Sequence, residues 1–429
     1  MTIINKHSVH SFTVFILLSV LLTACSSGGP IHETSLTDYK QLENSSSKNN
    51  QQSKEKITLK DNKTSSNKKN TLNCTLTISP GDSFYSAFND LNPGDTLCLN
   101  DGLYQQHMDI PSNIHVRAVH DGKAEIDGMS QLGEAWRGGL VQLKGNNSSV
   151  RGLRVHHAGK TSHTCHMSGN NNTMRFMSCS HAGSNKHKNP IFISGTGHLL
   201  EDSWAFGKGR YNIQCFKGKN ITLRRNVARW DITTMNTPTE PNAAFSIYNC
   251  SNVTIENNIS IDYAKSNQRM KFGADFYAPH NPKIWPKGNI NNHFLGNYSI
   301  NHALGNLNRR GMMFDGNGRS NASNNVIKDF TVTGSDFGIV IPSYVKDVKI
   351  QNCSFSKIDK RDINTDRFDC KGFAEDNVMY VNRKKTSQKL FPLKHQALIK
   401  ADMCRSGERQ SAWCSSNLTL SEYINSYLF

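Results

Sequence analysis

The chain lacks several features that would assign it at once to a class of protein. No two of its 11 cysteines have CxxC spacing, so neither a zinc ribbon nor a redox dithiol is indicated. The apolar run from Phe12 to Leu22 is too short for a stable membrane-spanning helix. Hydrophobic residues make up only 36% of the 429 residues, which is low for an α/β enzyme. That composition suffices for a narrow solenoid, in which every second strand residue faces outward.

Acidic residues are also scarce relative to basic ones. The chain has 34 Asp and Glu against 50 Lys and Arg, which gives a formal net charge of +16 and a pI near 9.3. Such a field suits nucleic acid, anionic lipid headgroups or an acidic polysaccharide. The sequence contains no recognisable nucleic-acid-binding module and its N-terminus predicts export, so no nucleic-acid partner is expected.

The N-terminal segment has the pattern of an exported lipoprotein. Lys6 precedes the apolar run, which ends in Leu22-Thr23-Ala24-Cys25 and so resembles the bacterial lipobox. The resemblance implies removal of residues 1–24, lipidation of Cys25 and attachment to a membrane through that lipid. Ser26 follows where an Asp would direct retention at the inner membrane. The resemblance therefore implies an outer-membrane lipoprotein that faces the periplasm or the cell surface.

Two near-copies of one segment predict the architecture. Residues 221–227 and 253–259 each alternate apolar and polar side chains, reach Asn226 or Asn258, and resume with an apolar residue. Alternation of this kind predicts β-strands. Similar segments recur at spacings of roughly 20 to 30 residues, which is typical of a solenoid in which each repeat forms one coil. The recurring Asn residues are expected to stack along an internal turn and to satisfy buried backbone groups there.

The start of the predicted solenoid carries a family resemblance. An amphipathic segment, Phe84 to Leu91, is followed by Pro93-Gly94-Asp95-Thr96 and then by Gly102-Leu103-Tyr104. This run resembles the N-terminal cap and first coil of right-handed parallel β-helix proteins of the pectate lyase-like superfamily. The resemblance implies an all-β fold, a right-handed parallel β-helix with an N-terminal helical cap and a small C-terminal cap. The superfamily includes polysaccharide lyases, hydrolases, epimerases and phage tailspikes, so the resemblance names no single reaction.

The predicted organisation follows from these segments. It comprises a signal peptide at 1–24, a lipidated cysteine and disordered tether at 25–70, the β-helix at 71–385 and a C-terminal cap at 386–429. Two short helices in the last part are expected to close the far end of the solenoid.

Export makes the ten remaining cysteines candidates for disulfides, because the compartment is oxidising. Sequence alone does not determine their pairing. Short spacings favour three bridges, Cys74–Cys98, Cys353–Cys370 and Cys404–Cys414. Four others are interpreted as small buried residues within coils: Cys165, Cys179, Cys215 and Cys250.

Insertions recur after the last strand of each coil and indicate one functional side. His157-Ala158-Gly159 and His181-Ala182-Gly183 form a direct repeat, and equivalent positions of neighbouring coils lie about 4.8 Å apart. The insertions are therefore expected to line a groove rich in basic and aromatic residues. Predicted catalytic residues are Lys271, Arg210, Tyr211 and Arg310. Predicted substrate-binding residues are His157, His181, Lys208, Arg229, Asp231 and Arg309.

These residue types suit β-elimination on a uronate. The reaction needs cations to neutralise the carboxylate and stabilise the enolate-like intermediate, and a base to remove the neighbouring proton. The sequence therefore favours a surface-tethered polysaccharide lyase that cleaves a uronate-containing acidic polysaccharide, such as a capsule or biofilm matrix. Lyases of the superfamily often use calcium held by Asp, so the resemblance implies Ca²⁺ as a possible cofactor. No Asp cluster in the sequence forms a strong calcium site, and no metal ligand is assigned.

Two alternatives stay open. A non-catalytic carbohydrate-binding or envelope protein would use the same basic groove, and a glycoside hydrolase would use paired carboxylates. The candidates for such a pair are Asp231, Asp275 and Asp315. A further set is weighed as a metal cluster but interpreted as surface or turn histidines, because its members lie on different faces of adjacent turns: His156, His157, His163 and His166.

Overall fold

The computed structural model describes most of the chain beyond its N-terminal segment. Described are residues 73–133, 138–229, 242–261, 273–283, 288–301, 309–315, 322–335, 337–342, 345, 347–351, 353–356, 367–368, 378–381, 390–405 and 412–428. Residues 1–69 and 70–429 form two separate units, and all the described residues belong to the second. Within them, no helix combines the length and apolar character that a membrane span requires.

The strands of the second unit form three sheets, here named A, B and C. Sheet A contains β1 (Leu76–Ile78), β2 (Thr96–Leu99), β5 (His115–Ala118), β8 (Ser149–Arg151), β11 (Thr173–Arg175), β14 (Leu199–Glu201), β17 (Lys219–Arg224), β20 (Ser251–Glu256), β23 (His293–Leu295), β26 (Asn325–Lys328), β29 (Val348–Gln351) and β32 (Val378–Val381). Sheet B contains β3 (Gly102–Tyr104), β6 (Ala124–Asp127), β9 (Leu153–His156), β12 (Ser178–Ser180), β15 (Trp204–Phe206), β18 (Val227–Ala228), β21 (Ile259–Ile261), β24 (Tyr298–Ile300), β27 (Thr331–Thr333) and β30 (Ser354–Ser356). Sheet C contains β4 (Met108–Ile110), β7 (Gly139–Leu143), β10 (His163–Met167), β13 (Ile191–Ile193), β16 (Tyr211–Phe216), β19 (Asn242–Tyr248), β22 (Gly273–Pro279), β25 (Arg309–Asp315), β28 (Phe337–Val340) and β31 (Arg367–Phe368).

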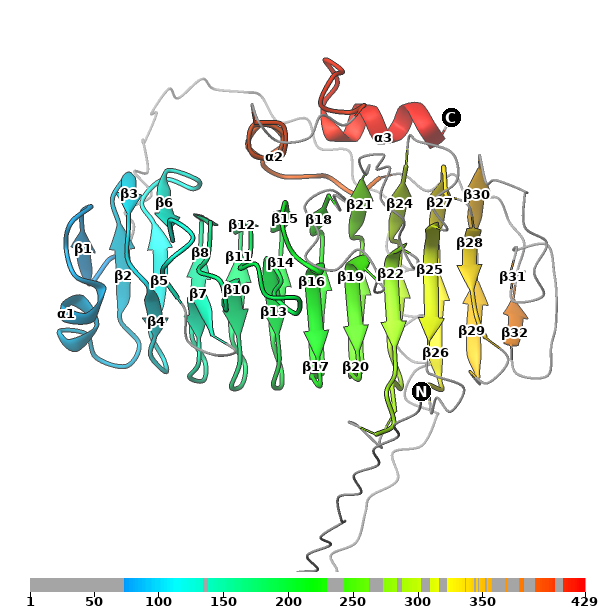
Figure 1. The fold of residues 1–429 in the computed structure, drawn as a ribbon, viewed down its shortest axis with the longest axis horizontal. Helices are drawn as coiled ribbons and strands as arrows, with labels where there is room; N and C mark the ends of the chain where they lie inside the picture. The colour runs from blue at the N-terminus through cyan, green and yellow to red at the C-terminus, as the bar shows by residue number, and fades with distance from the viewer. Residues whose placement is uncertain are drawn as a thin grey trace, which may run out of the picture. The chain divides into compact units, whose positions relative to one another are not determined.

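Each coil passes through sheet A, then B, then C, so that neighbours within a sheet come from successive coils (Figure 1). The strands pair in parallel, except that β28 and β31 are antiparallel. Ile221 pairs in register with Val253 and Val227 with Ile259, which confirms that the two near-copies are equivalent parts of adjacent coils. The fold is a right-handed parallel β-helix, as predicted.

A short helix covers the first coil, as the resemblance implies. Helix α1 (Phe84–Asn89) begins after Ser83, whose hydroxyl accepts a hydrogen bond from the Ser86 amide at 3.3 Å. Phe84 is buried and its ring stacks on that of Tyr104, with the centroids 5.5 Å apart. The helix therefore shields from water the apolar interior that the first coil would otherwise expose.

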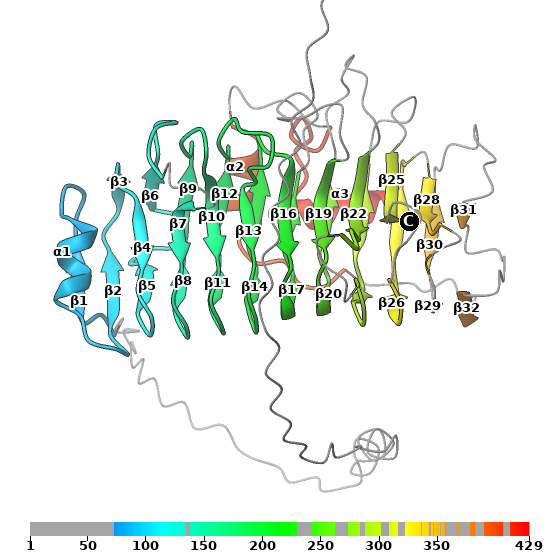
Figure 2. The same ribbon diagram turned by 60° about the horizontal axis from the view of Figure 1, so that its bottom comes forward.

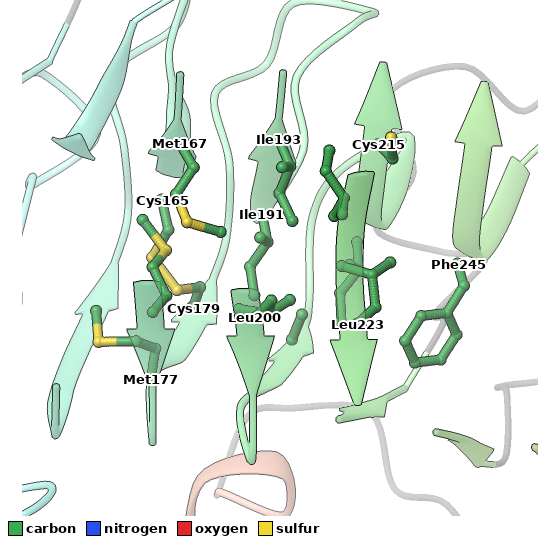
Figure 3. Close-up of a cluster of buried hydrophobic side chains, with 14 of the residues drawn as sticks. Cys165, Met167, Met177, Cys179, Ile191, Ile193, Leu200, Cys215, Leu223 and Phe245 are labelled. Carbon is green, nitrogen blue, oxygen red and sulfur yellow. A yellow bond between two sulfur atoms is a disulfide. The ribbon is translucent and has the colours of Figure 1, made fainter. Parts of the chain in front are cut away.

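Disulfides cross the interior of the coils. Cys165 on β10 and Cys179 on β12 are bonded, with their Cα atoms 6.2 Å apart (Figure 3). Cys215 is bonded to Cys250. The prediction that these four are unpaired small residues is wrong. Cys165 and Cys179 face each other across the core from strands of sheets C and B, and Cys215 on β16 meets Cys250 in the turn before β20. The predicted bridges Cys74–Cys98 and Cys404–Cys414 are confirmed. Cys370 lies outside the described residues.

A ladder of buried asparagines follows the turn from sheet A to sheet B. The Asn226 side-chain amide donates to Asn258 Oδ1 at 2.9 Å, and that of Asn258 donates to Asn297 Oδ1 at 3.1 Å. The same oxygens accept the backbone N–H groups of Asn226 and Asn258. The predicted role of these residues, satisfying buried backbone groups, is confirmed.

The two C-terminal helices lie on the outer face of sheet B. Helices α2 (Gln396–Met403) and α3 (Leu420–Leu428) belong to one apolar cluster with side chains of β15, β18, β21 and β24 (Figure 1). The prediction that these helices close the far end of the solenoid is wrong, because they cover the outer face of sheet B instead. The outward side chains of these strands are large and apolar, Trp204 and Ile259 among them, so this face must be covered.

Candidate functional site

The outer faces of sheets A and B leave little room for a site. On sheet A, Glu201 accepts from Arg175 at 2.8 Å and from Arg224 at 3.1 Å. Much of the positive charge on the outer face of this sheet is therefore paired. On sheet B, the apolar part is covered by the C-terminal helices. Sheet C therefore carries the candidate site.

The outer face of sheet C is polar and aromatic. Successive strands place their outward residues in one row, which we call the sheet C face, and Figure 2 shows these strands side by side from a second direction. The row consists of Asp109, Gln142, His166, Phe192, Gln214, Ser246, Tyr277 and Met313. Side chains on the outer face do not pack in the interior of the coils, so the stability of the coils requires few of these residue types. The row is therefore a candidate for binding.

Three partly exposed aromatic side chains, here called the aromatic run, cross successive strands of this face. Phe192 on β13 lies 6.1 Å from Phe216 on β16, and Phe216 lies 5.4 Å from Tyr248 on β19, measured between ring centroids. Each of the three is partly exposed. The Lys217 ammonium lies 5.4 Å from the Phe216 ring centroid. The run thus presents apolar ring surface to solvent with a cation beside it.

A hydrogen-bonded network supports the aromatic run from the preceding turn. The Asn189 side-chain amide donates to Gln214 Oε1 at 2.6 Å, and its oxygen accepts from the Tyr211 amide at 2.9 Å. The Asn189 backbone N–H donates to His163 Nδ1 at 3.1 Å. These buried bonds fix the start of β16 relative to β10 and β13, because leaving any of the groups unpaired would be costly.

A phenol and a carboxylate meet further along the face. The Tyr277 hydroxyl donates to Asp315 Oδ2 at 2.6 Å, and its ring centroid lies 6.2 Å from that of Tyr211. Burial, together with the nearby Tyr211 and Asp315, raises the pKa of Tyr277 well above its ordinary value of 10. Tyr277 is therefore protonated at neutral pH and acts as a donor, not as a base.

The structure brings two of the predicted catalytic residues together and places a third in the same row. The Arg210 guanidinium lies over the Tyr211 ring, 4.9 Å from its centroid, at the start of β16. Registers connect Tyr211 through Ala243 and Ala274 to Arg310. Arg310 is thus three coils away, roughly 14 Å at about 4.8 Å per coil.

The repeated histidines lie in neighbouring coils, as predicted, but toward sheet B. The His157 and His181 ring centroids are 5.1 Å apart, and His181 also meets the edge of Phe206 on sheet B. The Lys208 carbonyl accepts the Ala182 amide at 2.8 Å, which places Lys208 in the next coil. These three predicted binding residues therefore follow the turn between sheets B and C and do not enter the sheet C face.

Arg229 lies elsewhere. It is only 1% exposed, and its guanidinium donates to the Met403 carbonyl beneath the C-terminal helices. This position removes it from any groove, although the sequence predicts contact with substrate. The sequence does not show that a segment more than 170 residues later folds over this strand.

The remaining predicted residues are placed as follows. Asp275 points into the coil, where it accepts from Ser260 at 2.8 Å and from Asn301 at 2.9 Å, so it is unavailable for a solvent-exposed carboxylate pair. Lys271, Asp231, Cys25 and the side chain of Arg309 lie outside the described residues.

The interpretation of His163 and His166 as surface or turn histidines is wrong, because both are buried within β10. His166 lies on the sheet C face. It is 7% exposed, and neither ring nitrogen has a hydrogen-bond partner. Burial first, and then the charges of Lys188 and Lys144, lower the pKa of His166 from 6.5 to about 4. The signal was present in the sequence, because the apolar neighbours Cys165 and Met167 face inward and so turn His166 outward.

Stability is expected to fall with acidification because of this histidine. The unfolded chain takes up the proton near pH 6.5 and the folded chain only near pH 4, so stability is lost as pH falls between these values. The loss attributable to His166 approaches about 3 kcal/mol. Urea denaturation at pH 7 and pH 4.5 measures it. In His166→Gln the loss should shrink by about that amount, whereas His120→Gln, at an exposed histidine, should behave like the parent. An unchanged pH dependence in His166→Gln contradicts the prediction.

Within the described part of the chain, the sheet C face holds no group of three possible metal ligands, so it does not fit the calcium that the family resemblance implies. Calcium takes six to eight oxygen ligands. Among the residues with described positions, the group of three possible metal ligands is Asp127, His156 and His157, and two of its donors are nitrogens. No step of the proposed chemistry passes through calcium.

Comparison with known proteins gives limited information. No family model matches the chain, and no curated protein matches it. Among solved structures it is similar to the pectate lyase Pel9A, with 16% identity and a TM-score of 0.45 over 67% of this chain and 78% of that one. It is also similar to the pectin methylesterase PemA from Erwinia chrysanthemi, with 8% identity and a TM-score of 0.38 over 68% and 92%. A third is the tailspike protein gp49 from Acinetobacter baumannii bacteriophage Fri1, a capsular polysaccharide depolymerase, with 12% identity and a TM-score of 0.42 over 66% and 53%. Similarity at this level does not define an activity.

Proposed function

We propose that the protein is a lipid-tethered polysaccharide lyase that cleaves a uronate-containing acidic polysaccharide by β-elimination on the sheet C face. The observation that carries the proposal is the aromatic run, Phe192, Phe216 and Tyr248, with Lys217 beside it. Sugar rings have apolar C–H faces that pack on aromatic rings, and a uronate adds a carboxylate that pairs with a cation.

The spacing of the aromatic run suits an extended polymer. The three aromatic residues come from consecutive strands of sheet C, so a polysaccharide lying along the solenoid would meet them in succession. The overall positive charge of the chain attracts such a polymer before contact.

The elimination requires three groups around one sugar. A base removes the proton from the carbon next to the carboxylate, the electron pair forms a carbon–carbon double bond, and the bond to the glycosidic oxygen breaks. The leaving oxygen takes a proton. Arg210 supplies a cation for the carboxylate, and the ring of Tyr211 lies 4.9 Å from that guanidinium. Lys271 remains a predicted base, since it lies two residues before β22 in the sequence.

Tyr277 and Asp315 have a different role in this scheme. The raised pKa of Tyr277 keeps its phenol protonated, so it does not compete as the base. Its hydrogen bond holds the Asp315 carboxylate in place on the face. The hydrolase alternative needs a second carboxylate beside Asp315. Asp275 does not supply it, because its side chain lies inside the coil.

The tether explains how the enzyme would meet its substrate. Lipidation of Cys25 and a polar segment up to residue 70 would hold the β-helix near the outer membrane, where acidic capsule or matrix polymers occur. Metabolic labelling with a lipid precursor should mark the parent chain and not Cys25→Ser.

A panel of acidic polysaccharides tests the reaction. The purified chain is incubated with each polymer, and both the ultraviolet absorbance of unsaturated uronate ends and the number of reducing ends are measured. The proposal expects both to rise together on at least one polymer. Reducing ends without absorbance would establish a hydrolase instead, and retention on a polymer column without cleavage would establish a binding protein.

Removing the central ring of the aromatic run should weaken polymer binding. Phe216→Ala is expected to raise the KM or the Kd for the polymer about fivefold or more, because a stacked aromatic ring typically contributes about 1 kcal/mol or more. Tyr85→Ala is the matched control, since Tyr85 is 78% exposed on α1, outside the sheet C face. Equal affinity of Phe216→Ala and the parent chain would remove the aromatic run from the binding site.

A further inference from the structure

A second cluster of chemically active side chains lies on the outer edge of sheet B. It is formed by Glu125 and Asp127 on β6, His156 at the end of β9 and His157 in the turn that follows. The strands β6 and β9 are paired in register, which brings the four residues together from adjacent coils.

Three donor atoms of this cluster surround one point. His156 Nδ1 lies 2.9 Å from His157 Nδ1 and 3.9 Å from Asp127 Oδ1, and His157 Nδ1 lies 3.2 Å from the same oxygen. A tetrahedral zinc ion with bonds of about 2.0–2.1 Å has ligands separated by roughly 3.3 Å. The three observed separations are centred on that value.

The remaining contacts prepare His156 as a ligand. Its Nε2 lies 2.6 Å from Glu125 Oε1, so this nitrogen carries the proton and Nδ1 presents its lone pair. Glu125 is held in turn by Arg154 at 3.0 Å. A carboxylate that orients a histidine from behind is the usual second layer of a metal site.

The backbone of His157 serves the same arrangement. Its φ of +55° is left-handed, as is that of His181, the equivalent residue of the next coil, at +53°. This conformation starts the turn and directs the ring back toward His156, with the two centroids 4.5 Å apart. In the absence of a cation, a single proton on His157 Nδ1 would have to serve both His156 and Asp127.

We propose that Asp127, His156 and His157 bind a first-row divalent transition metal such as Zn²⁺. Two imidazoles and one carboxylate favour this class over Ca²⁺ or Mg²⁺, which take oxygen ligands. Three protein ligands leave a fourth position to water or an exogenous ligand. This site is separate from the sheet C face and revises the interpretation of His156 and His157 as isolated turn residues.

Metal titration of the full-length chain tests the proposal. After treatment with a chelator, the protein is titrated with Co²⁺ and followed by visible absorption, and with Zn²⁺ and followed by calorimetry. The expected result is one equivalent of tightly bound metal with the strong absorption of four-coordinate Co²⁺. Absence of stoichiometric binding overturns the proposal.

Variants assign the ligands. His156→Ala and His157→Asn should each weaken Zn²⁺ binding more than about 100-fold, and Glu125→Gln about tenfold. Asparagine is chosen at 157 because it tolerates the positive φ. The matched control is His120→Ala, which removes a surface histidine 3.0 Å from Asp101 and should leave binding unchanged. Circular dichroism and thermal unfolding verify that each variant folds, and parental affinity in folded His156→Ala or His157→Asn overturns the assignment.

Discussion

Replacing Trp204 with alanine is expected to weaken the attachment of the C-terminal helices to the solenoid. The free energy needed to detach and unfold these helices should fall by about 3–5 kcal/mol. Trp204 is 1% exposed and packs in the apolar cluster that joins sheet B to α2 and α3. Its indole N–H also donates to Asp402 Oδ2 at 2.8 Å, and Asp402 pairs with Arg154 at 2.8 Å. Removal of the ring leaves a cavity and a buried carboxylate with one donor fewer.

Limited proteolysis and hydrogen exchange measure this effect locally. The segment 390–428 should become sensitive in Trp204→Ala, while the coils far from β15 keep their protection, because a solenoid transmits contacts mainly between neighbours. Trp204→Phe retains most of the apolar contact and should lose only about 1–2 kcal/mol. Parental protection of the C-terminal helices in Trp204→Ala would show that other contacts hold them.

Replacing Asn258 with alanine is expected to destabilise the central coils by about 4 kcal/mol. The side-chain amide of Asn258 donates to the Leu223 carbonyl at 2.9 Å, and its oxygen accepts the Asn226 backbone N–H at 3.0 Å. Both of those backbone groups are buried, and each unsatisfied group costs about 1–3 kcal/mol. The substitution also breaks the ladder on both sides, toward Asn226 and toward Asn297.

Asn170→Ala provides the matched control for the ladder. The Asn170 side chain donates to Asn146 Oδ1 at 3.0 Å in the same manner from coil to coil, but on the exposed surface. Water replaces that bond, so the control should lose less than about 1 kcal/mol. Urea unfolding monitored by circular dichroism compares the two variants. Equal stabilities would mean that burial does not strengthen the ladder.

The fold was predictable because its repeats are local. Alternation in residues 221–227 and 253–259 predicts strands, and a recurring Asn predicts the ladder. Alternation does not reveal which side faces inward, however. On sheet B, Ser260 and Ala205 face the interior, whereas Ile259 and Trp204 face outward beneath the C-terminal helices. The prediction that Arg229 binds substrate failed for this reason, since the segment that covers it is distant in sequence.

The site was predictable only in part. Arg210 and Tyr211 were identified from their residue types and their place after a turn, and the structure puts them on one edge of the sheet C face. The aromatic run was missed, because Phe192, Phe216 and Tyr248 are far apart in the sequence and each alone resembles a core residue. Their alignment depends on the register between coils. This register is not evident from the sequence, because loops of unequal length separate the strands.

The repeat around His157 and His181 also has a consequence for how such a chain changes length. The two turns stack directly, with the Ala158 amide bound to the His181 carbonyl at 3.1 Å, so residues 157–180 constitute one complete coil. The disulfide Cys165–Cys179 lies wholly within that unit. Duplication or deletion of this unit would leave no cysteine without its disulfide partner. The chain would also continue from the equivalent position in the turn between sheets B and C. Genetic variation could thereby lengthen or shorten the sheet C face by whole coils, while both ends of the protein keep their structure.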